Sequence, residues 1–398
     1  MGAAPQRFDR ALVVGDAGGA GWAKAQIAEI AAALQFIGIK AVALDVEAAL
    51  LAIKSLPRDS FFVVDANNRL DIGDRARKFS FMVDHPCQLL KRVRGDELRS
   101  TIFGWVDASH SEGIAAIGVE AHSIFLPHAG PDPTPKPLPM QERDIDVFFA
   151  GGLGETVERS AWLAQRPGTP EILADVIFTA ASAAETTLDP ILDIFAASCV
   201  RHGLDISASF SRPAFCTVIG EILRIAETNR RNAVLEALPD VTVCVVSEYL
   251  PVRFRDRPNI RHLPYTDDFD SLRRLMARSK LVLNTTCKFP SGSHERIWFG
   301  MAEGAAILTD ASHFMQRSFR HAENIFYLPQ SRAEAGHLAY LGALVKNPAA
   351  LDAVAQNAVS IYAKHHTWKR RISWLNAAVQ HELPTAAATP SAIAASAR

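Results

Sequence analysis

The chain has 398 residues, enough for two domains, and 48% of them are hydrophobic, as in globular proteins with large cores. Its 42 Lys and Arg residues are balanced by 43 Asp and Glu residues, which argues against a dedicated nucleic-acid binder, because such proteins usually carry a basic excess. The five cysteines are scattered and form no CxxC pair. The sequence also shows no signal-peptide core and no apolar run of ~18–20 residues. We therefore expect a cytoplasmic protein.

The first 130 residues alternate short apolar runs with helical patterns. Strands are predicted at 11–15, 39–45, 61–66, 79–84, 101–107 and 123–127, and a helix from Trp22 to about Phe36. Strands at this spacing indicate a parallel sheet covered by helices on both faces, so residues 1–130 are predicted to form a doubly wound, Rossmann-like α/β domain. The glycines of DAGGAG, residues 16–21, have the wrong spacing for a GxGxxG dinucleotide motif.

The segment that follows is rich in proline. AGPDPTPKPLPMQERD, residues 129–144, contains five prolines and almost no apolar periodicity. Because proline stiffens a chain and cannot continue a sheet ladder, we predict an interdomain linker over 131–144.

A second strand-and-turn pattern starts at IDVFFAGG and predicts a second α/β domain over 145–365. Residues 157–237 read as mainly helical, strands are predicted at 241–247, 260–265, 281–286, 306–310 and 325–329, and helices at 269–280, 294–303 and from about Arg332 to Gln380. The low-complexity tail at 384–398 is predicted to be disordered. In open α/β sheets ligands bind beyond the carboxyl ends of the strands, so two such sheets facing each other would form a cleft.

The stretch SGSHERIWFGMAEGAAILTD, residues 291–310, carries the strongest indication of function. It follows a predicted strand, and Ser291 or Ser293 is expected to cap a helix that starts near His294. A helix N-terminus suits an anion, and Arg296 would add charge-assisted bonds to a phosphate. The structural alternative is that the serines only cap, that Arg296 pairs with Glu295 at the surface and that His294 is solvated.

This stretch resembles the donor half of GT-B glycosyltransferases, in a bacterial group-1-like branch with a His-x-Arg triplet. The segments MVDHP, VDASH and FLPHAG at 82–86, 106–110 and 125–130, and VFFAGG at 147–152, also resemble that branch. The resemblance implies a metal-independent hexosyltransferase that uses a nucleotide-sugar, with UDP expected, as substrate and needs no cofactor. It departs from the common retaining pattern, because the two glutamates eight positions apart are replaced by Ser291 and Phe299. Retention and inversion therefore both stay open.

Donor-binding residues follow from the strand ends, the glycine turn and the resemblance. Tyr249 and Tyr265 would stack on the base, although each is equally compatible with an ordinary core edge. The full set is Gly151, Gly152, Ser247, Tyr249, Tyr265, Thr286, Lys288, Ser291, Gly292, Ser293, His294, Glu295 and Arg296.

Acceptor-side candidates are polar residues at strand ends of the first domain. They are His85, Asp107, His110 and His128, and one of them would be the general base if the enzyme inverts. Metal binding is a rival interpretation, but the spacing matches no tight metal motif, so we predict no metal site. The plain alternative is that His85 and His128, each beside a proline, only bond to loops.

The C-terminal sequence HHTWKRRISW, residues 365–374, is basic and aromatic. The resemblance implies that a helix at 366–383 crosses back onto the first domain, and the segment could also touch an anionic membrane or an acidic acceptor. The acceptor itself stays open between protein, polysaccharide, lipid-linked and small molecules. The alternatives to a glycosyltransferase are a nucleotide-sugar epimerase of the same architecture and a non-catalytic, two-lobed ligand-binding protein.

Overall fold

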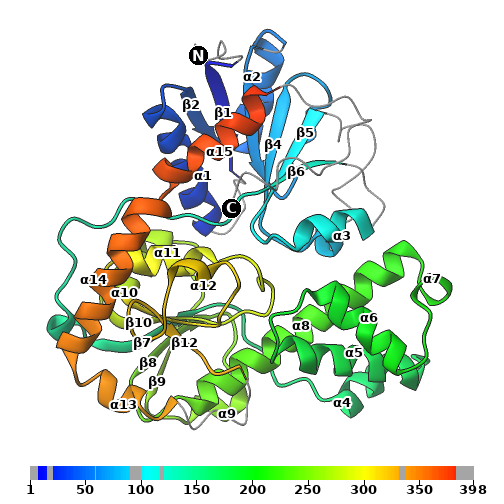
Figure 1. Cartoon of the computed structure of the whole chain (residues 1–398), viewed down its shortest axis with the longest axis vertical. Helices are drawn as coiled ribbons and strands as arrows, with labels where there is room; N and C mark the ends of the chain where they lie inside the picture. The colour runs from blue at the N-terminus through cyan, green and yellow to red at the C-terminus, as the bar shows by residue number, and fades with distance from the viewer. Residues whose placement is uncertain are drawn as a thin grey trace. The chain divides into compact units, whose positions relative to one another are not determined.

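In a computed structural model the chain forms two compact units, residues 1–127 with 368–398 (unit 1) and residues 128–367 (unit 2). The structure describes residues 8–15, 21–58, 60–89, 100–116, 121–330 and 338–381. The predicted tail at 384–398 and all but the last residue of the DAGGAG turn lie outside these residues. Each unit contains one six-stranded sheet with helices packed against it (Figure 1).

Unit 1 is built on a parallel sheet with the strand order β2-β1-β3-β4-β5-β6. Its strands are β1 (Arg10–Val14), β2 (Lys40–Leu44), β3 (Phe62–Ala66), β4 (Arg77–Met82), β5 (Thr101–Trp105) and β6 (His122–Phe125), and its helices include α1 (Gly21–Phe36), α2 (Val46–Ser55) and α3 (His110–Ala116). Every residue of β4 and β5 is buried, as expected for central strands covered on both faces. The predicted Rossmann-like architecture is confirmed for this unit.

The last helix of the described chain, α15 (Trp368–Gln380), also belongs to unit 1. Its Trp368 Nε1 donates a hydrogen bond of 2.8 Å to Gln26 of α1, and its indole meets Phe81 of β4 edge to face at 5.4 Å. Arg371, 1% exposed, donates to the carbonyl of Pro127 at 2.8 Å. The two ends of the described chain therefore contribute to the same core.

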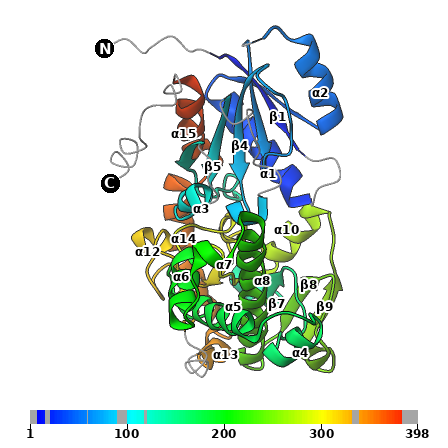
Figure 2. The same cartoon turned by 90° about the vertical axis from the view of Figure 1, so that its right-hand side faces the viewer.

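Unit 2 contains a second parallel sheet with the order β12-β11-β10-β7-β8-β9, of which Figure 2 labels β7, β8 and β9. Its strands are β7 (Ile145–Ala150), β8 (Val243–Ser247), β9 (Ile260–Pro264), β10 (Ser279–Asn284), β11 (Ala306–Thr309) and β12 (Phe326–Tyr327). The helices around it are α9 (Val252–Arg255), α10 (Phe269–Ala277), α11 (Glu295–Ala302), α12 (Met315–Ser318), α13 (Leu341–Leu344) and α14 (Pro348–His365). The central strands β7 and β10 pair directly, so the loops that follow them leave the same edge of the sheet.

Between β7 and β8 the chain forms the predicted helical region, which Figure 1 shows to one side of the sheet. It consists of α4 (Arg159–Ala164), α5 (Glu171–Ala184), α6 (Ile191–Arg201), α7 (Ile206–Ser209) and α8 (Arg212–Ala237). The end of the long α8 joins the core of the sheet through Val234 and Leu235. Residues of α8 therefore reach the loops around β7 and β10.

The predicted linker at 131–144 belongs to unit 2 and is bonded to the elements around it. Thr134 donates to the carbonyl of Ala302 at 2.8 Å, and Met140 is 1% exposed in the core. Gly304, at a φ of 70°, lies so close to this segment that a Cβ there would come within 2.7 Å of Pro137. Arg143 donates to the carbonyls of Leu138, Ser279 and Glu303. This proline-rich segment therefore belongs to no sheet, but hydrogen bonds hold it in place along the surface of the unit.

Candidate donor site

The loop between β10 and α11 ends in a helix cap that differs from the prediction. His294 is the N-cap residue, and its Nδ1 accepts the backbone N–H of Arg296 at 3.2 Å. Ser293, 2% exposed, instead accepts a hydrogen bond of 3.0 Å from the indole of Trp298. The expected serine cap is therefore wrong, and Ser293 helps to hold the buried face of α11.

Arg296 in the first turn of α11 is buried, with 8% of its surface exposed. Its Nη1 donates to Asn284 Oδ1 at the end of β10 at 2.8 Å, and its guanidinium lies 5.4 Å from the centre of the Phe149 ring. A Cβ at Gly151 would come within 3.3 Å of Arg296 Nη2, so the glycine turn after β7 leaves room for this side chain. The surface pair of Arg296 with Glu295, the structural alternative, is not formed.

None of the ion pairs formed by the described residues includes Arg296. Burial, followed by the nearby charge of Arg231, lowers the pKa of Arg296 to about 10. A buried cation that forms no direct ion pair is costly, because it has lost its water and the nearby Glu295 and Glu227 offset that loss only in part. The site therefore favours an anion.

A second cation comes from α8, which the sequence analysis passed over. Arg231 donates from Nη1 to the carbonyl of Gly152 at 2.8 Å and from Nη2 to Glu227 Oε1 at 2.6 Å. Asn229 and Asn232, on the same helix, bond to Val157 and Gly154. The run TNRRN at 228–232, in a largely apolar helix, is the sequence pattern that could have indicated this polar contact with the loop after β7.

Glu227 connects α8 to the loop after β10. Its carboxylate accepts a hydrogen bond of 3.1 Å from Thr286 and lies 3.3 Å from Lys288 Nζ. Burial opposes ionisation of this carboxyl, but Arg231 and Lys288 more than offset it and hold its pKa below the usual value. The cluster thus contains three cations, Arg231, Lys288 and Arg296, beside Glu227 and the Glu295 of α11.

Arg230, next to Arg231, has a different role. It pairs with Asp310 at 2.7 Å, and Asp310 in turn accepts the N–H of Thr286 at 2.9 Å. Arg230 also donates to the carbonyls of Pro329 and Gln330. This pair fixes the ends of β11 and β12 against α8 and leaves no surplus charge.

His128 lies in unit 2 beside α11, and not in the first domain where it was predicted. Its Nε2 is 3.4 Å from Glu295 Oε2, which is 3.1 Å from His294 Nδ1. The rings of Phe289 and His294 are each 6.1 Å from that of His128. Burial, followed by the charge of Arg296, lowers the pKa of His294 well below 6.5, so its imidazole is neutral.

The residues predicted to hold the base lie at the end of β8 and in the loops that follow β8 and β9. Ser247 is buried and donates to the carbonyl of Tyr249 at 2.8 Å. Tyr249 and Tyr265 are 36% and 42% exposed, so neither ring is enclosed in the core. Tyr249 donates to Glu155, and Tyr265 donates to Asp267 at 2.9 Å. Both rings are held by carboxylates at the surface.

The structure brings together the three remaining acceptor-side candidates, which follow β4 and β5 in unit 1. The rings of His85 and His110 lie edge to face at 5.0 Å, and the exposed fractions of His85, Asp107 and His110 are 3%, 0% and 0%. Asp107 Oδ1 accepts two hydrogen bonds from Ser109, at 2.9 Å and 2.6 Å. Within the described residues, no three His, Cys, Asp or Glu side chains are grouped as metal ligands.

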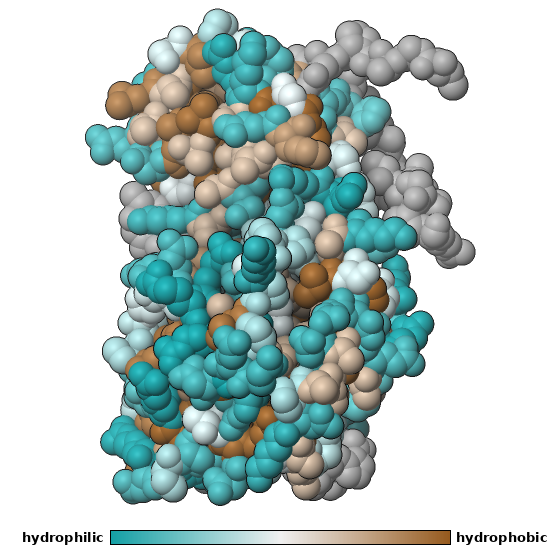
Figure 3. All heavy atoms as spheres, turned by 90° about the vertical axis from the view of Figure 1, so that its left-hand side faces the viewer, coloured by the Kyte–Doolittle hydropathy of each residue, from teal (hydrophilic) through white to brown (hydrophobic). Residues whose placement is uncertain are grey.

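The basic and aromatic C-terminal segment splits between core and surface. Trp368 is 1% exposed and Trp374 is 48% exposed. Hydrophobic side chains also gather on unit 1 in the upper part of Figure 3, and the exposed ones of α1, β2 and α2 include Phe36, Val42 and Leu51. Of the helices in the described ranges, none combines the length and the apolar character that crossing a bilayer requires.

Comparison with known proteins bears on this arrangement. Residues 230–377, which contain Arg231 and the β10–α11 connection, match the family model described as glycosyl transferase-like. The chain has the fold of GT-B glycosyltransferases, which the solved structures described below share. This confirms the predicted GT-B resemblance, whereas the His-x-Arg branch stays a prediction. No curated protein matched the sequence.

Several solved GT-B structures resemble the chain in fold. An alpha-glucosyltransferase in complex with UDP-glucose and DNA containing an abasic site has 10% identity and a TM-score of 0.56, with 94% of this chain and 100% of that chain covered. Anabaena Alr3699/HepE, in complex with UDP and glucose, has 11% identity, a TM-score of 0.51 and coverage of 93% and 99%. Sucrose-phosphate synthase from Thermosynechococcus elongatus has 8% identity, a TM-score of 0.50 and coverage of 94% and 98%. The chain spans 55% of the length of TarM, a further match.

Proposed function

We propose that this GT-B protein transfers a hexose from a UDP-sugar to an acceptor hydroxyl, without a metal ion. The observation that carries the proposal is the buried Arg296, which lacks a carboxylate partner in the described structure and stands in the first turn of α11. Solved structures of the same fold with UDP or UDP-glucose support the choice of donor.

The reaction requires positive charge where the nucleotide leaves. When the acceptor oxygen bonds to the anomeric carbon, the bond from that carbon to the β-phosphate oxygen breaks and its electron pair stays on UDP. Arg296 and the partial positive charge of the α11 N-terminus would stabilise this charge, with Arg231 and Lys288 nearby. These side chains supply the charge that a divalent cation supplies in other transferases.

Of the four candidates for proton transfer, His128 lies in the same unit as the proposed donor site. We propose that His128 takes the proton from the acceptor hydroxyl and that Glu295, 3.4 Å away, orients its ring. His85, Asp107 and His110 would then position the acceptor. This assignment implies inversion at the anomeric carbon.

The missing second glutamate of the retaining pattern fits this proposal. Phe299, which occupies that position, is 1% exposed and packs edge to face on Phe269 at 4.6 Å. A residue so placed belongs to the core of unit 2. Ribose or sugar hydroxyls would therefore be bound by other acceptors, of which Glu295 is the nearest to Arg296 in sequence.

Calorimetric titration with UDP, GDP, ADP and CDP, in buffer containing EDTA, tests the donor site. We expect UDP to bind best, and Arg296→Gln to weaken it ~100-fold, because a charge-assisted bond to phosphate contributes ~1.5–3 kcal/mol. Arg274→Gln, at an exposed pair on α10, is the matched control and should not change the affinity. No binding of any nucleotide to the folded protein would remove the proposal.

Incubation with UDP-sugars separates the enzymatic alternatives. Release of UDP that increases with an added acceptor indicates transfer, whereas a changed sugar configuration without acceptor indicates an epimerase. Tight UDP binding with neither outcome would favour a binding protein.

A further inference from the structure

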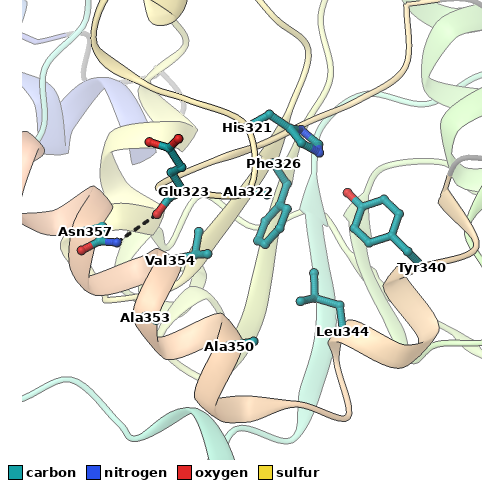
Figure 4. A pocket seen from close by; sticks show the side chains of 10 residues that line it. All are labelled: His321, Ala322, Glu323, Phe326, Tyr340, Leu344, Ala350, Ala353, Val354 and Asn357. Atoms are coloured by element: carbon teal, nitrogen blue, oxygen red, sulfur yellow. Dashed lines mark hydrogen bonds between the residues drawn. The ribbon is translucent and has the colours of Figure 1, made fainter.

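Unit 2 has a pocket near the amino ends of its strands, whereas the donor loops leave the carboxyl ends. The candidate donor residues follow the carboxyl ends of β7 and β10, whereas residues 321–324 lead into the amino end of β12. This segment, Tyr340 and the first half of α14 surround a pocket of about 600 Å³ (Figure 4). Its volume lies within the ~300–1,000 Å³ of small-molecule sites.

The pocket has an apolar floor and a polar, accessible rim. Phe326 and Val354 on the floor are 3% and 7% exposed, while Tyr340 at the rim is 38% exposed. Asn357 of α14 donates a hydrogen bond of 3.0 Å to the carbonyl of Glu323 (Figure 4). This bond joins the two walls and leaves the amide oxygen of Asn357 as an acceptor.

Three aromatic rings form one side of the pocket. The ring of Phe326 lies 6.3 Å from that of Tyr340 at 42°, and 6.1 Å from that of His321 at 89°. Nδ1 of His321 accepts the N–H of Tyr327 at 3.0 Å, so a neutral imidazole carries its proton on Nε2 and can donate it. The rings therefore combine apolar faces with hydrogen-bonding edges.

The charges around the pocket select against phosphate. Among the described residues that line the pocket there is no Lys or Arg, and their one carboxylate, that of Glu323, would repel an anion. A neutral sugar ring fits better, because its apolar face packs on aromatic rings while its hydroxyl groups bond to side chains at the rim.

We propose that this pocket binds a neutral hexose unit of a glycan, at a site separate from the donor site. The choice of a glycan rests on the proposed glycosyl transfer. A transferase that acts on a saccharide would use such a site to bind its acceptor or product while the reaction takes place elsewhere. The pocket would raise the local concentration of a long acceptor, while a single free sugar would gain little from it.

Native gel electrophoresis in gels containing glycogen, hydroxyethyl cellulose or galactomannan tests the proposal without any activity assay. We expect at least one of these neutral polysaccharides to retard the protein. Tyr340→Ala, which removes a rim ring, and Ala353→Trp, which fills the space at an exposed helix position, should each weaken the retardation at least ~5-fold. Trp374→Ala removes an exposed ring of unit 1 and should leave it unchanged.

The same preparations are titrated with UDP, and their melting temperatures are compared, so that the two proposals can fail separately. Retardation by no polysaccharide, or equal retardation of wild type and both folded pocket variants, would overturn the glycan site. Absence of UDP binding with pocket-dependent retardation would instead overturn the donor site and leave this inference standing.

Discussion

The two parallel sheets of this GT-B protein both end in polar side chains, but the charges there are balanced differently. In unit 1, Asp107 accepts two bonds from Ser109, and Asp84 accepts one of 2.8 Å from Asn67. In unit 2, Arg296 is buried, and among the described residues its side chain donates a hydrogen bond only to the neutral amide of Asn284. Polar residues at a strand end are therefore weak indicators of a ligand when their neighbours satisfy them, and a surplus of buried charge is a stronger one.

The largest effect on stability is expected at Arg230, whose buried charge is balanced by Asp310. Arg230→Met should lower the free energy of unfolding by ~3–5 kcal/mol, because it leaves Asp310 without its cation. Urea unfolding measures this, with Arg274→Met as the control, since its pair with Asp268 is exposed and contributes little. A loss below ~1 kcal/mol would mean that the Arg230 pair is screened by solvent.

Exchange of one histidine in each unit tests where proton transfer takes place. His128→Gln should slow release of UDP from UDP-glucose ~100-fold, in the range for a lost general base, and change the affinity for UDP less than ~3-fold. The counterpart His85→Gln should have the smaller effect on this release. If His85→Gln were the slower variant, the base would belong to unit 1 and our assignment would be wrong.

The second cation should contribute less to donor binding than Arg296. Arg231→Gln is expected to weaken UDP binding ~10-fold, which is ~1.4 kcal/mol, because Lys288 and Thr286 still hold Glu227. Calorimetry measures this change. Arg224→Gln, on the same helix but paired with Glu221, is the control and should bind UDP as the wild type does.

The smallest effect concerns pH. The folded-state pKa of His294 lies well below 6.5, owing to burial and then Arg296, so the unfolded chain takes up a proton that the folded chain does not. This stability is complete above pH 6.5 and falls as the pH drops below that value, by at most ~1.4 kcal/mol per pH unit.

His294→Asn keeps a side chain that can cap α11 but removes the titration. Its urea-unfolding free energy should therefore fall less than that of the wild type between pH 7 and pH 5.5. Parallel losses in the two proteins would show that other groups dominate this range.

The sequence predicted the two sheets well, because each strand is an apolar run between turn residues and needs no distant partner to be recognised. The β10–α11 connection could be found for the same reason, since Lys288 and Arg296 lie close together in the chain. Arg231 and Glu227 lie on a helix more than 50 residues earlier and reach the loop only through tertiary packing. The linker at 131–144 stays a prediction, but composition alone could not reveal that Arg143 joins this segment to Ser279 and Glu303 by hydrogen bonds.

The position of α15 has a consequence for the order in which the protein can fold. Unit 2 is continuous in sequence, whereas unit 1 needs Trp368 and Arg371, which leave the ribosome after all of unit 2. Nascent unit 1 would expose the surface beneath α15, including Phe81, throughout the synthesis of unit 2. Ribosome-bound chains that stop near residue 365 should therefore carry a protease-sensitive first unit, which becomes resistant only when the last helix has emerged.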